Sequence, residues 1–464
     1  MNNGAIIIFG ATGDLSKKKL MPAIYKLVAS KKVNNFIIVG VALEDITVEQ
    51  LLNQVKEFIP VIDEQVWENI QNRTYYQQLN IMRKEGFKSL NTLVTKLEKK
   101  YGLPGNRLLY LAVAAHFFCP ITHHAAQSGL VKRLSEREDY WNRIVYEKPF
   151  GHNLQSAQEI NKCIDKWFNE SQIYRIDHFL TKEIVSNIAL IRFTNCVFEP
   201  LWNNRFIDHI QIVLSEKIGI QERGSYYDHY GALCDVVQNH MLELLALVAM
   251  EAPEKLTGEY VRSERAKVLE KVRFVDGVLG QYTSYTKEKD VKPNSQTETF
   301  TALYLTVDNR RWAGVPFYLK TGKCLDKKET VIHIKFKQVD CLLLRNCPTE
   351  SNWLTIKIAP DATFSLRLNA KKPGFNNELV PVSMEFCHSC IFGPYTPQAY
   401  EIVFEEIMRG EQATSVRFDE IEYAWRIIDY IKEQDLPLSL YACGSTGPKE
   451  SELFAKKHGI RWRS

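Results

Sequence analysis

The stretch "IIIFGATGDLSKKK" (residues 6–19) decides the fold of the first part of the chain. Its apolar run ends at Phe9, and Gly10, Gly13 and a helical pattern follow at once. Glycines at a strand-to-helix turn let the backbone approach a pyrophosphate, whose charge the amides and dipole of the helix N-terminus favour. The stretch predicts a first strand, a tight turn and a dinucleotide site, although such turns also use glycine for steric reasons alone.

Further apolar runs follow at 36–42, 107–115 and 143–149, separated by helical patterns. This alternation indicates right-handed βαβ units and a parallel sheet covered on both faces. From about Arg192 the runs are longer and alternate with period two, as in "ETVIHIKFKQVD", which is typical of a half-buried antiparallel sheet. The expected fold is α/β + α+β: a Rossmann-like doubly wound domain over 1–177, and a domain with a large antiparallel sheet flanked by helices over 178–464.

Composition excludes several classes of protein. The 464 residues exceed the size of a single core, and the 59 basic and 55 acidic side chains leave a net charge of +4, too weak and evenly spread for a nucleic-acid surface. The N-terminus reads as a strand rather than a signal peptide, and the longest other apolar run, 244–250, is too short to span a bilayer. We expect a cytoplasmic protein with no nucleic-acid or membrane partner.

The ten cysteines have no repeating spacing, which favours reduced thiols over a disulfide framework. Cys387 and Cys390 form a C-x-x-C with Cys341 and Cys347 upstream, so a four-thiolate zinc site is conceivable. The upstream pair has the wrong spacing for the usual zinc knuckle. We expect buried thiols and no metal.

The end of the predicted second strand carries Leu43, Glu44 and Asp45. An arginine here would bind the 2′-phosphate of NADP, whereas an acid would accept a hydrogen bond from the free 2′-hydroxyl of NAD and repel the phosphate. The two acids can equally be solvated turn residues.

A later strand ends in Glu147, Lys148 and Pro149. An X-Pro bond at this position is a candidate for a cis peptide, which would fix the direction of the lysine. Ligands bind at the carboxyl edge of a doubly wound sheet, so this favours a binding role for Lys148 over a plain strand terminator.

In "RIDHFLTKE" (residues 175–183), His178 and Lys182 are four apart and would share one face of a helix, where both could bind one phosphate. Asp177 lies about 100° around that helix from His178 and would address another partner. An amphipathic helix with solvated charges remains an alternative.

Asp235, Gln238, Asn239 and His240 precede a strongly apolar helical run. A histidine entering a buried helix usually satisfies a nearby acceptor. Asp235 and His240 are five apart, about 140° around an α-helix, so periodicity does not make them partners.

Together these motifs resemble the glucose-6-phosphate dehydrogenase family. The resemblance covers nearly the whole chain and is carried by "GATGDLSKKKLMPAIYKL", "YEKPFGHN", "YRIDHFLTKEIVSNI", "DVVQNHMLELLALVAME", "GVPFYLKTGKCL" and "GSTGPKES". It implies hydride transfer from C1 of glucose 6-phosphate to NADP or NAD, giving 6-phosphogluconolactone, the first step of the oxidative pentose phosphate pathway. It also implies a homodimer or homotetramer.

The resemblance assigns roles to individual residues. His240 is the implied general base and Asp177 orients it. The implied substrate-binding residues are Lys148, His178, Lys182, Glu216, Asp235, Lys323 and Lys328. The expected cofactor-binding residues are Gly10, Ala11, Thr12, Gly13, Asp14, Leu15, Lys17, Glu44, Tyr110 and Lys148.

This chain departs from the family pattern at several positions. Phe179 replaces a common tyrosine and removes a hydroxyl contact to the phosphate, and Thr181, Ala114 and Ala115 replace a usual glycine and two prolines. Leu43 stands where an arginine normally binds the 2′-phosphate. The preference for NADP over NAD is therefore expected to be relaxed or reversed, although Lys17 and Lys18 could compensate.

Two alternatives remain at this stage. The first is a sugar oxidoreductase of another family that acts on an unphosphorylated sugar, which would leave His178 and Lys182 without a purpose. The second is a non-catalytic dinucleotide-binding module, which would be expected to have lost His240, Asp177 or Lys182, all of which are present.

Overall fold

The computed structural model describes residues 3–134, 139–339, 350–374, 378–387, 390–391, 393 and 397–463. The chain forms two compact units. The first contains Met1–Thr181, Lys255–Arg262 and Pro397–Glu422, and the second contains Lys182–Glu254, Ser263–Thr396 and Tyr423–Ser464. The predicted division at 177/178 thus differs from the structure, which adds two later segments to the first unit.

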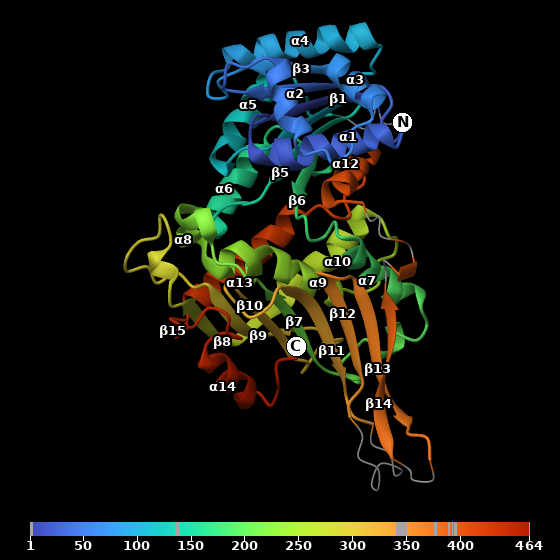
Figure 1. The fold of residues 1–464 in the computed structure, drawn as a ribbon, viewed down its shortest axis with the longest axis vertical. Coiled ribbons are helices and arrows are strands. Elements are labelled where there is room, and N and C mark those ends of the chain that lie inside the picture. Colours follow the sequence, from blue (N-terminus) through green and yellow to red (C-terminus); the bar gives the residue numbers. More distant parts are fainter. Residues whose placement is uncertain are drawn as a thin grey trace. The chain divides into compact units, whose positions relative to one another are not determined.

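The first unit is built on a six-stranded parallel sheet (Figure 1) in the order β3-β2-β1-β4-β5-β6. This is the Rossmann order, so the doubly wound prediction is confirmed. Its strands are β1 (Gly4–Phe9), β2 (Phe36–Ala42), β3 (Thr74–Gln78), β4 (Arg107–Leu111), β5 (Asn142–Glu147) and β6 (Ile173–Ile176). Its helices include α1 (Met21–Ala29), α2 (Val48–Lys56), α3 (Glu64–Arg73), α4 (Glu85–Tyr101), α5 (Phe118–Gln127), α6 (Leu154–Asp165) and α12 (Ala399–Arg409).

Both faces of this sheet are buried, as the continuous apolar run of β1 predicted. Ile6 and Ile8 pack into a core with α1, α3 and α12, whereas Ile7 and Phe9 pack into a second core with α4 and α5. In Figure 1, α4 and α12 lie on opposite sides of the sheet. The buried side chains of α12 explain why this late segment belongs to the first unit.

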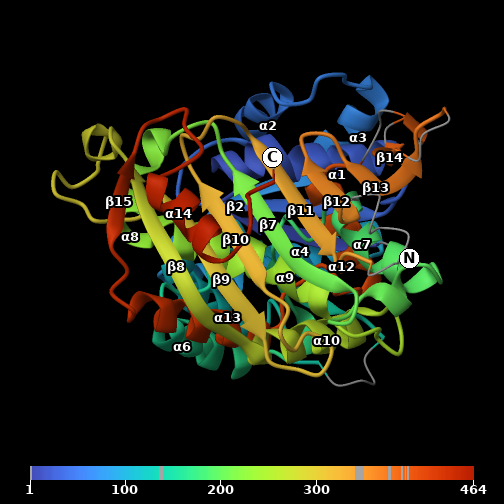
Figure 2. The same cartoon turned by 90° about the horizontal axis from the view of Figure 1, so that it is seen from below.

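The second unit is built on a nine-stranded sheet in the order β14-β13-β12-β11-β7-β10-β9-β8-β15, whose strands lie side by side in Figure 2. Most neighbours are antiparallel, as predicted, but β7 pairs with β10 and β8 with β15 in parallel. The strands are β7 (Ile207–Ser215), β8 (Val272–Tyr282), β9 (Phe300–Val307), β10 (Phe317–Gly322), β11 (Glu329–Phe336), β12 (Trp353–Ala359), β13 (Thr363–Lys371), β14 (Leu379–Cys387) and β15 (Leu438–Tyr441).

The helical segments that include parts of the second unit are α7 (Glu183–Thr194), α8 (Gly224–Ala232), η6 (Leu233–Met241), α9 (Leu242–Ala249), α10 (Gly258–Lys271), α13 (Phe418–Lys432) and α14 (Lys449–Lys457). Among the described residues, Gln221–Ala249 is the stretch long and apolar enough to cross a membrane, but 94% of its most apolar window is buried inside the structure. This stretch is therefore a buried core segment of the second unit.

A buried ion pair ties α4 to the start of β4 in the first unit. The Arg107 guanidinium donates to both carboxylate oxygens of Glu98, at 2.8 and 2.6 Å, and to the Leu130 carbonyl at 2.9 Å. Replacing one partner leaves the other charge buried and uncompensated, which is costly.

Arg107→Met is therefore expected to lower the free energy of unfolding by about 3 to 5 kcal/mol, measured by denaturant unfolding. The matched control is Lys18→Met, which breaks the solvent-exposed Lys18–Asp14 pair and should cost less than about 1 kcal/mol. The double variant Arg107→Met/Glu98→Leu should recover part of the loss, and a single-variant loss no larger than the control's would contradict this account.

Candidate active site

The glycine turn after β1 is tightly packed against the end of β4. Gly10 has φ +81°, and a Cβ there would lie 2.3 Å from the Ala112 carbonyl oxygen. The Gly13 amide donates to the Gly10 carbonyl at 3.0 Å, and the Lys17 amide donates to the Gly13 carbonyl at 3.1 Å. The buried Ser16 hydroxyl has no hydrogen-bond partner among the described residues. A turn that excludes side chains and leaves a donor unpaired beside a helix N-terminus fits a dinucleotide phosphate.

The acidic end of β2 lies against this turn. The Glu44 carboxylate accepts a 2.9 Å hydrogen bond from the Thr12 hydroxyl, and the Glu44 carbonyl accepts one of 2.6 Å from Tyr76. Burial, with the Glu44 and Asp45 charges, raises the pKa of Tyr76 to about 12. Leu43 is 64% exposed. The predicted acid thus sits beside the glycine turn.

Asp14 and Lys17 belong to the same turn. Asp14 is exposed, and its hydrogen bond from Lys18, at 2.9 Å, lowers its pKa. Lys17 is partly buried and contributes its amide to the helix start.

A partly buried acid, Glu147, lies at the carboxyl end of β5. Tyr110 donates a 2.5 Å hydrogen bond to the Glu147 carboxylate, and Tyr400 of α12 also hydrogen-bonds it. Burial raises the pKa of Glu147 to about 7 against these two bonds and the Lys148 charge, and the Asp177 charge raises it further. Tyr110, expected among the cofactor-binding residues, is fully buried, and its hydroxyl hydrogen is donated to Glu147. The Lys148–Pro149 peptide bond is cis, as predicted.

Residues 177–182 form a turn after β6 rather than the predicted helix, because α7 begins only at Glu183. The Asp177 carboxylate accepts the Phe179 amide at 2.8 Å, and the Thr181 hydroxyl donates to the His178 carbonyl at 2.9 Å. An Asp side chain that captures an amide two residues on stabilises a turn instead of a helix. The helical face proposed for His178 and Lys182 is therefore wrong.

Two predicted residues of the second unit meet because their strands are parallel. Glu216 follows β7, Lys323 follows β10, and Gly322 pairs with Ser215 in register. The buried Lys323 ammonium forms an ion pair with the Glu216 carboxylate. Lys328, at the start of the next strand, is exposed.

His240 and Asp235 lie on the π-helical segment η6, and both are buried. The Asp235 carboxylate lies 3.4 Å from the Arg223 guanidinium. Residues five apart in a π-helix are one hydrogen-bonded turn apart, so the 140° separation expected for an α-helix is wrong here.

The cysteine prediction is wrong for six residues, which form the disulfides Cys119–Cys163, Cys324–Cys443 and Cys387–Cys390. Cys387 and Cys390 are therefore not free thiolate ligands. Cys341 and Cys347 lie outside the described residues. Spacing along the chain could not reveal these pairs, because two of them join segments far apart in sequence.

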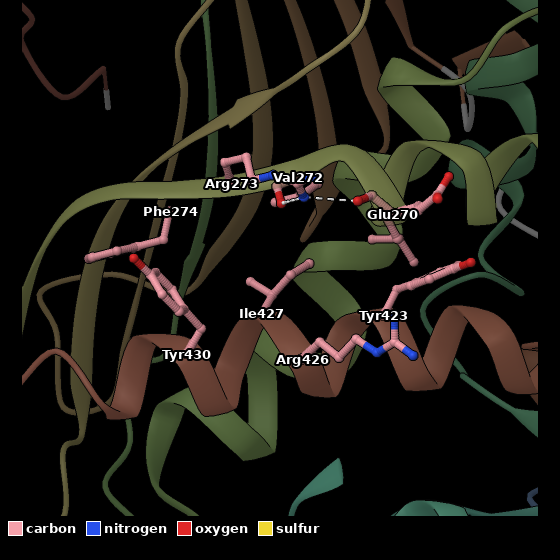
Figure 3. A pocket seen from close by; sticks show the side chains of 9 residues that line it. Glu270, Val272, Arg273, Phe274, Tyr423, Arg426, Ile427 and Tyr430 are labelled. Carbon is pink, nitrogen blue, oxygen red and sulfur yellow. Dashed lines mark hydrogen bonds between the residues drawn. The ribbon is translucent and has the colours of Figure 1, made fainter.

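A separate hollow of about 440 Å³ lies between α10, β8 and α13 (Figure 3). The Arg273 guanidinium donates to the carbonyls of Glu270 and Val272 at its edge. None of the predicted site residues lines it.

A Rossmann sheet with a glycine turn after β1, joined to a large mixed sheet, is an architecture found in nicotinamide-dependent oxidoreductases. The chain matches the family model "Glucose-6-phosphate dehydrogenase, NAD binding domain" over residues 7–187 and "Glucose-6-phosphate dehydrogenase, C-terminal domain" over 189–463. The chain belongs to the glucose-6-phosphate dehydrogenase family, as the sequence motifs predicted.

Relatives and solved structures agree with this family. The chain is 40% identical to the glucose-6-phosphate 1-dehydrogenase of Bacillus subtilis strain 168, with 98% of this chain and 97% of the relative covered. A glucose-6-phosphate 1-dehydrogenase from Mycobacterium avium superposes with a TM-score of 0.86 at 32% identity, covering 100% of this chain and 99% of that one. A glucose-6-phosphate dehydrogenase in complex with glucose 6-phosphate superposes with a TM-score of 0.92 at 32% identity and the same coverage.

Sequence reasoning missed Tyr400 and Arg223. No local signal joins Tyr400 to Glu147, because α12 reaches the first unit only through the tertiary fold. No local signal joins Arg223 to Asp235 either, because the chain bends between them at Gly231, which has φ +65°.

Glu147→Gln is expected to change how stability depends on pH. Between pH 4.5 and about 7 the unfolded carboxyl is ionised while the folded one keeps its proton, so stability from this group falls as pH rises. The variant should therefore gain about 2 kcal/mol on wild type between pH 5 and 8, less than the full linkage because Glu147 keeps some solvent contact.

Denaturant unfolding of both proteins at pH 5 and pH 8 measures this difference. Parallel stability curves for wild type and Glu147→Gln would show that Glu147 titrates alike in the folded and unfolded chains.

Proposed function

We propose that the protein oxidises C1 of glucose 6-phosphate and gives 6-phosphogluconolactone, with NAD or NADP as the electron acceptor. The observation that carries this proposal is the family match over both domains of a chain that retains every residue to which the family resemblance assigns a role. When bound, the nicotinamide accepts the hydride. The protein must bind the sugar phosphate, take the hydroxyl proton and exclude water.

The proposed base is His240. As the C1 hydride leaves, the C1 hydroxyl proton passes to the imidazole, which leaves a neutral lactone and avoids a build-up of negative charge on oxygen. Asp177 is the proposed orienting group, which holds one ring nitrogen so that the other faces the hydroxyl. Support comes from the burial of both side chains, since water then competes less for the proton.

The phosphate and sugar are assigned to charged side chains. His178 and Lys182 are the proposed phosphate ligands, because charge-assisted hydrogen bonds are the strong ones. Lys148, Glu216, Asp235, Lys323 and Lys328 are the proposed sugar ligands. Phe179 offers no hydroxyl to the phosphate, so the proposed phosphate contacts come from His178 and Lys182.

His240→Asn is expected to lower kcat by at least about 10²-fold while the melting temperature changes little, because the amide keeps similar size but cannot take a proton. Formation of reduced nicotinamide is followed by absorbance. The matched control is His229→Asn, since His229 is exposed and its ring contacts the Ser225 carbonyl one helical turn earlier. A near-wild-type rate in His240→Asn would remove this residue from the base role.

The same assay tests the substrate class. Glucose 6-phosphate should be used far better than glucose, because only the phosphorylated sugar engages His178 and Lys182. Equal kcat/KM values for the two sugars would favour the alternative sugar oxidoreductase instead.

We also propose that the cofactor preference is shifted toward NAD. The Glu44 carboxylate beside Thr12 would repel a 2′-phosphate and accept from a free 2′-hydroxyl, and Leu43 offers no positive charge. Lys17 and Lys18 favour any phosphate nearby, but Lys18 is already paired with Asp14.

Leu43→Arg is expected to raise the ratio of kcat/KM for NADP to that for NAD by about 10-fold or more, because a guanidinium pairs bidentately with phosphate. Leu43→Gln is the uncharged control of similar length. A strong NADP preference in the wild-type protein would overturn the proposal.

We further propose a cytoplasmic homodimer or homotetramer. The edge strand β14 exposes Val382 and Met384, and no described strand pairs with its outer side. Open apolar edges of this kind favour association.

A further inference from the structure

Tyr227 belongs to an aromatic core of the second unit and lies next to the charged side chain of Lys323. Its ring packs edge-on against Tyr285, with ring centroids 6.2 Å apart, and the Lys323 ammonium lies 5.1 Å from its ring centre. The side chain is 1% exposed. Tyr227 is therefore held rigidly beside two proposed sugar ligands, Lys323 and its ion-pair partner Glu216.

The Tyr227 hydroxyl is buried and has no hydrogen-bond partner among the described residues. Three other buried tyrosines of the same aromatic core do have partners: Tyr282 donates to Glu288 at 3.1 Å, Tyr285 to Asp228 at 3.0 Å and Tyr441 to the Lys323 carbonyl at 2.7 Å. A buried polar group left unpaired costs free energy, so an unpaired hydroxyl next to three paired ones calls for a partner outside the protein.

The surroundings keep this hydroxyl protonated. Burial raises the pKa of Tyr227 well above its usual value, and the negative charges of Asp235, Glu298 and Glu216 raise it further. The hydroxyl therefore stays a hydrogen-bond donor within the field of carboxylates that include two proposed sugar ligands.

A sugar needs donors as well as acceptors from its site. Each sugar hydroxyl donates one hydrogen bond and accepts up to two, whereas ionised Glu216 and Asp235 only accept. In this half of the site the Lys323 ammonium pairs with Glu216 and the Arg223 guanidinium lies against Asp235. Tyr227 is a neutral donor whose hydroxyl hydrogen has no acceptor within the part of the chain that the structure describes.

We propose that the Tyr227 hydroxyl donates a hydrogen bond to one hydroxyl of the bound sugar and so helps to determine which sugar is accepted. This inference rests on the proposed function and adds a specificity-determining residue to it. The phenol completes the acceptor pair Glu216 and Asp235 with a donor.

Tyr227→Phe tests this assignment because it removes one oxygen and keeps the ring. The KM for glucose 6-phosphate should rise about 5-fold to 10-fold with kcat changed less than about twofold, as expected for loss of one neutral hydrogen bond used in binding. The free energy of unfolding should stay the same or increase, because an unsatisfied buried oxygen is removed.

The matched control is Tyr285→Phe, which removes a neighbouring hydroxyl bonded to Asp228 within the protein. It should lose stability and leave KM unchanged. Tyr227→Phe should thus raise KM without a loss of stability, and Tyr285→Phe should lower stability without a change in KM. An unchanged KM in Tyr227→Phe would overturn the proposal.

Substrate analogues identify the sugar hydroxyl concerned. Glucose 6-phosphates that lack the 2-, 3- or 4-hydroxyl are each compared with the parent sugar, in wild type and in Tyr227→Phe. The penalty for one missing hydroxyl should disappear in the variant, because its partner is already absent. Unchanged penalties at every position would also overturn the proposal, whereas a wild-type protein inactive on glucose 6-phosphate would instead refute the proposed function.

Discussion

Parallel strand pairing is the constraint on which the assigned chemistry depends. Parallel neighbours end at the same edge of a sheet, so residues that follow them are brought together even when they are far apart in sequence. In the first unit Gly10, Glu44, Lys148 and Asp177 follow β1, β2, β5 and β6 at one edge. In the second unit, the parallel pair β7 and β10 within a mainly antiparallel sheet joins Glu216 to Lys323. An antiparallel arrangement of these two strands would have placed the two residues at opposite edges.

Much of the fold was predictable because burial on both faces of a parallel sheet leaves continuous apolar runs in the sequence. The sequence also predicted the tight glycine turn after β1 and the cis peptide bond between Lys148 and Pro149. Features that depend on contacts between distant parts of the chain could not be predicted. The apolar face of α12 and the disulfide Cys324–Cys443 unite segments that no local pattern connects. The helix predicted at 177–182 was wrong for another reason. The Asp177 side chain accepts the Phe179 amide and so stabilises a turn, although the spacing of His178 and Lys182 suits a helix.

Helical periodicity also misled the prediction around His240. The 140° separation of Asp235 and His240 assumed an α-helix, but η6 is π-helical, with one extra residue in each turn. Such segments are less stable than α-helix and are frequent at functional sites. Nothing in the sequence indicated a π-helix, because the apolar run after His240 continues as an ordinary buried α-helix in α9. The family resemblance pointed to this segment as part of the site, but only the structure showed that it is a π-helix.

The start of η6 shows how such a segment is held in place. Gly231 has φ +65°, and a Cβ at this residue would lie 2.3 Å from the Glu298 carboxylate, so only glycine fits the bend. Glu298 then accepts the Leu233 amide at 2.9 Å through its side chain and the Ala232 amide through its carbonyl. A buried carboxylate at a helix N-terminus is favoured by the helix dipole, which offsets part of the cost of its burial. Tyr227 lies before this bend and Asp235 after it, so the backbone between these two residues passes through the bend that Glu298 anchors. The relative placement of Tyr227 and Asp235 therefore depends on the backbone conformation that only glycine allows at position 231.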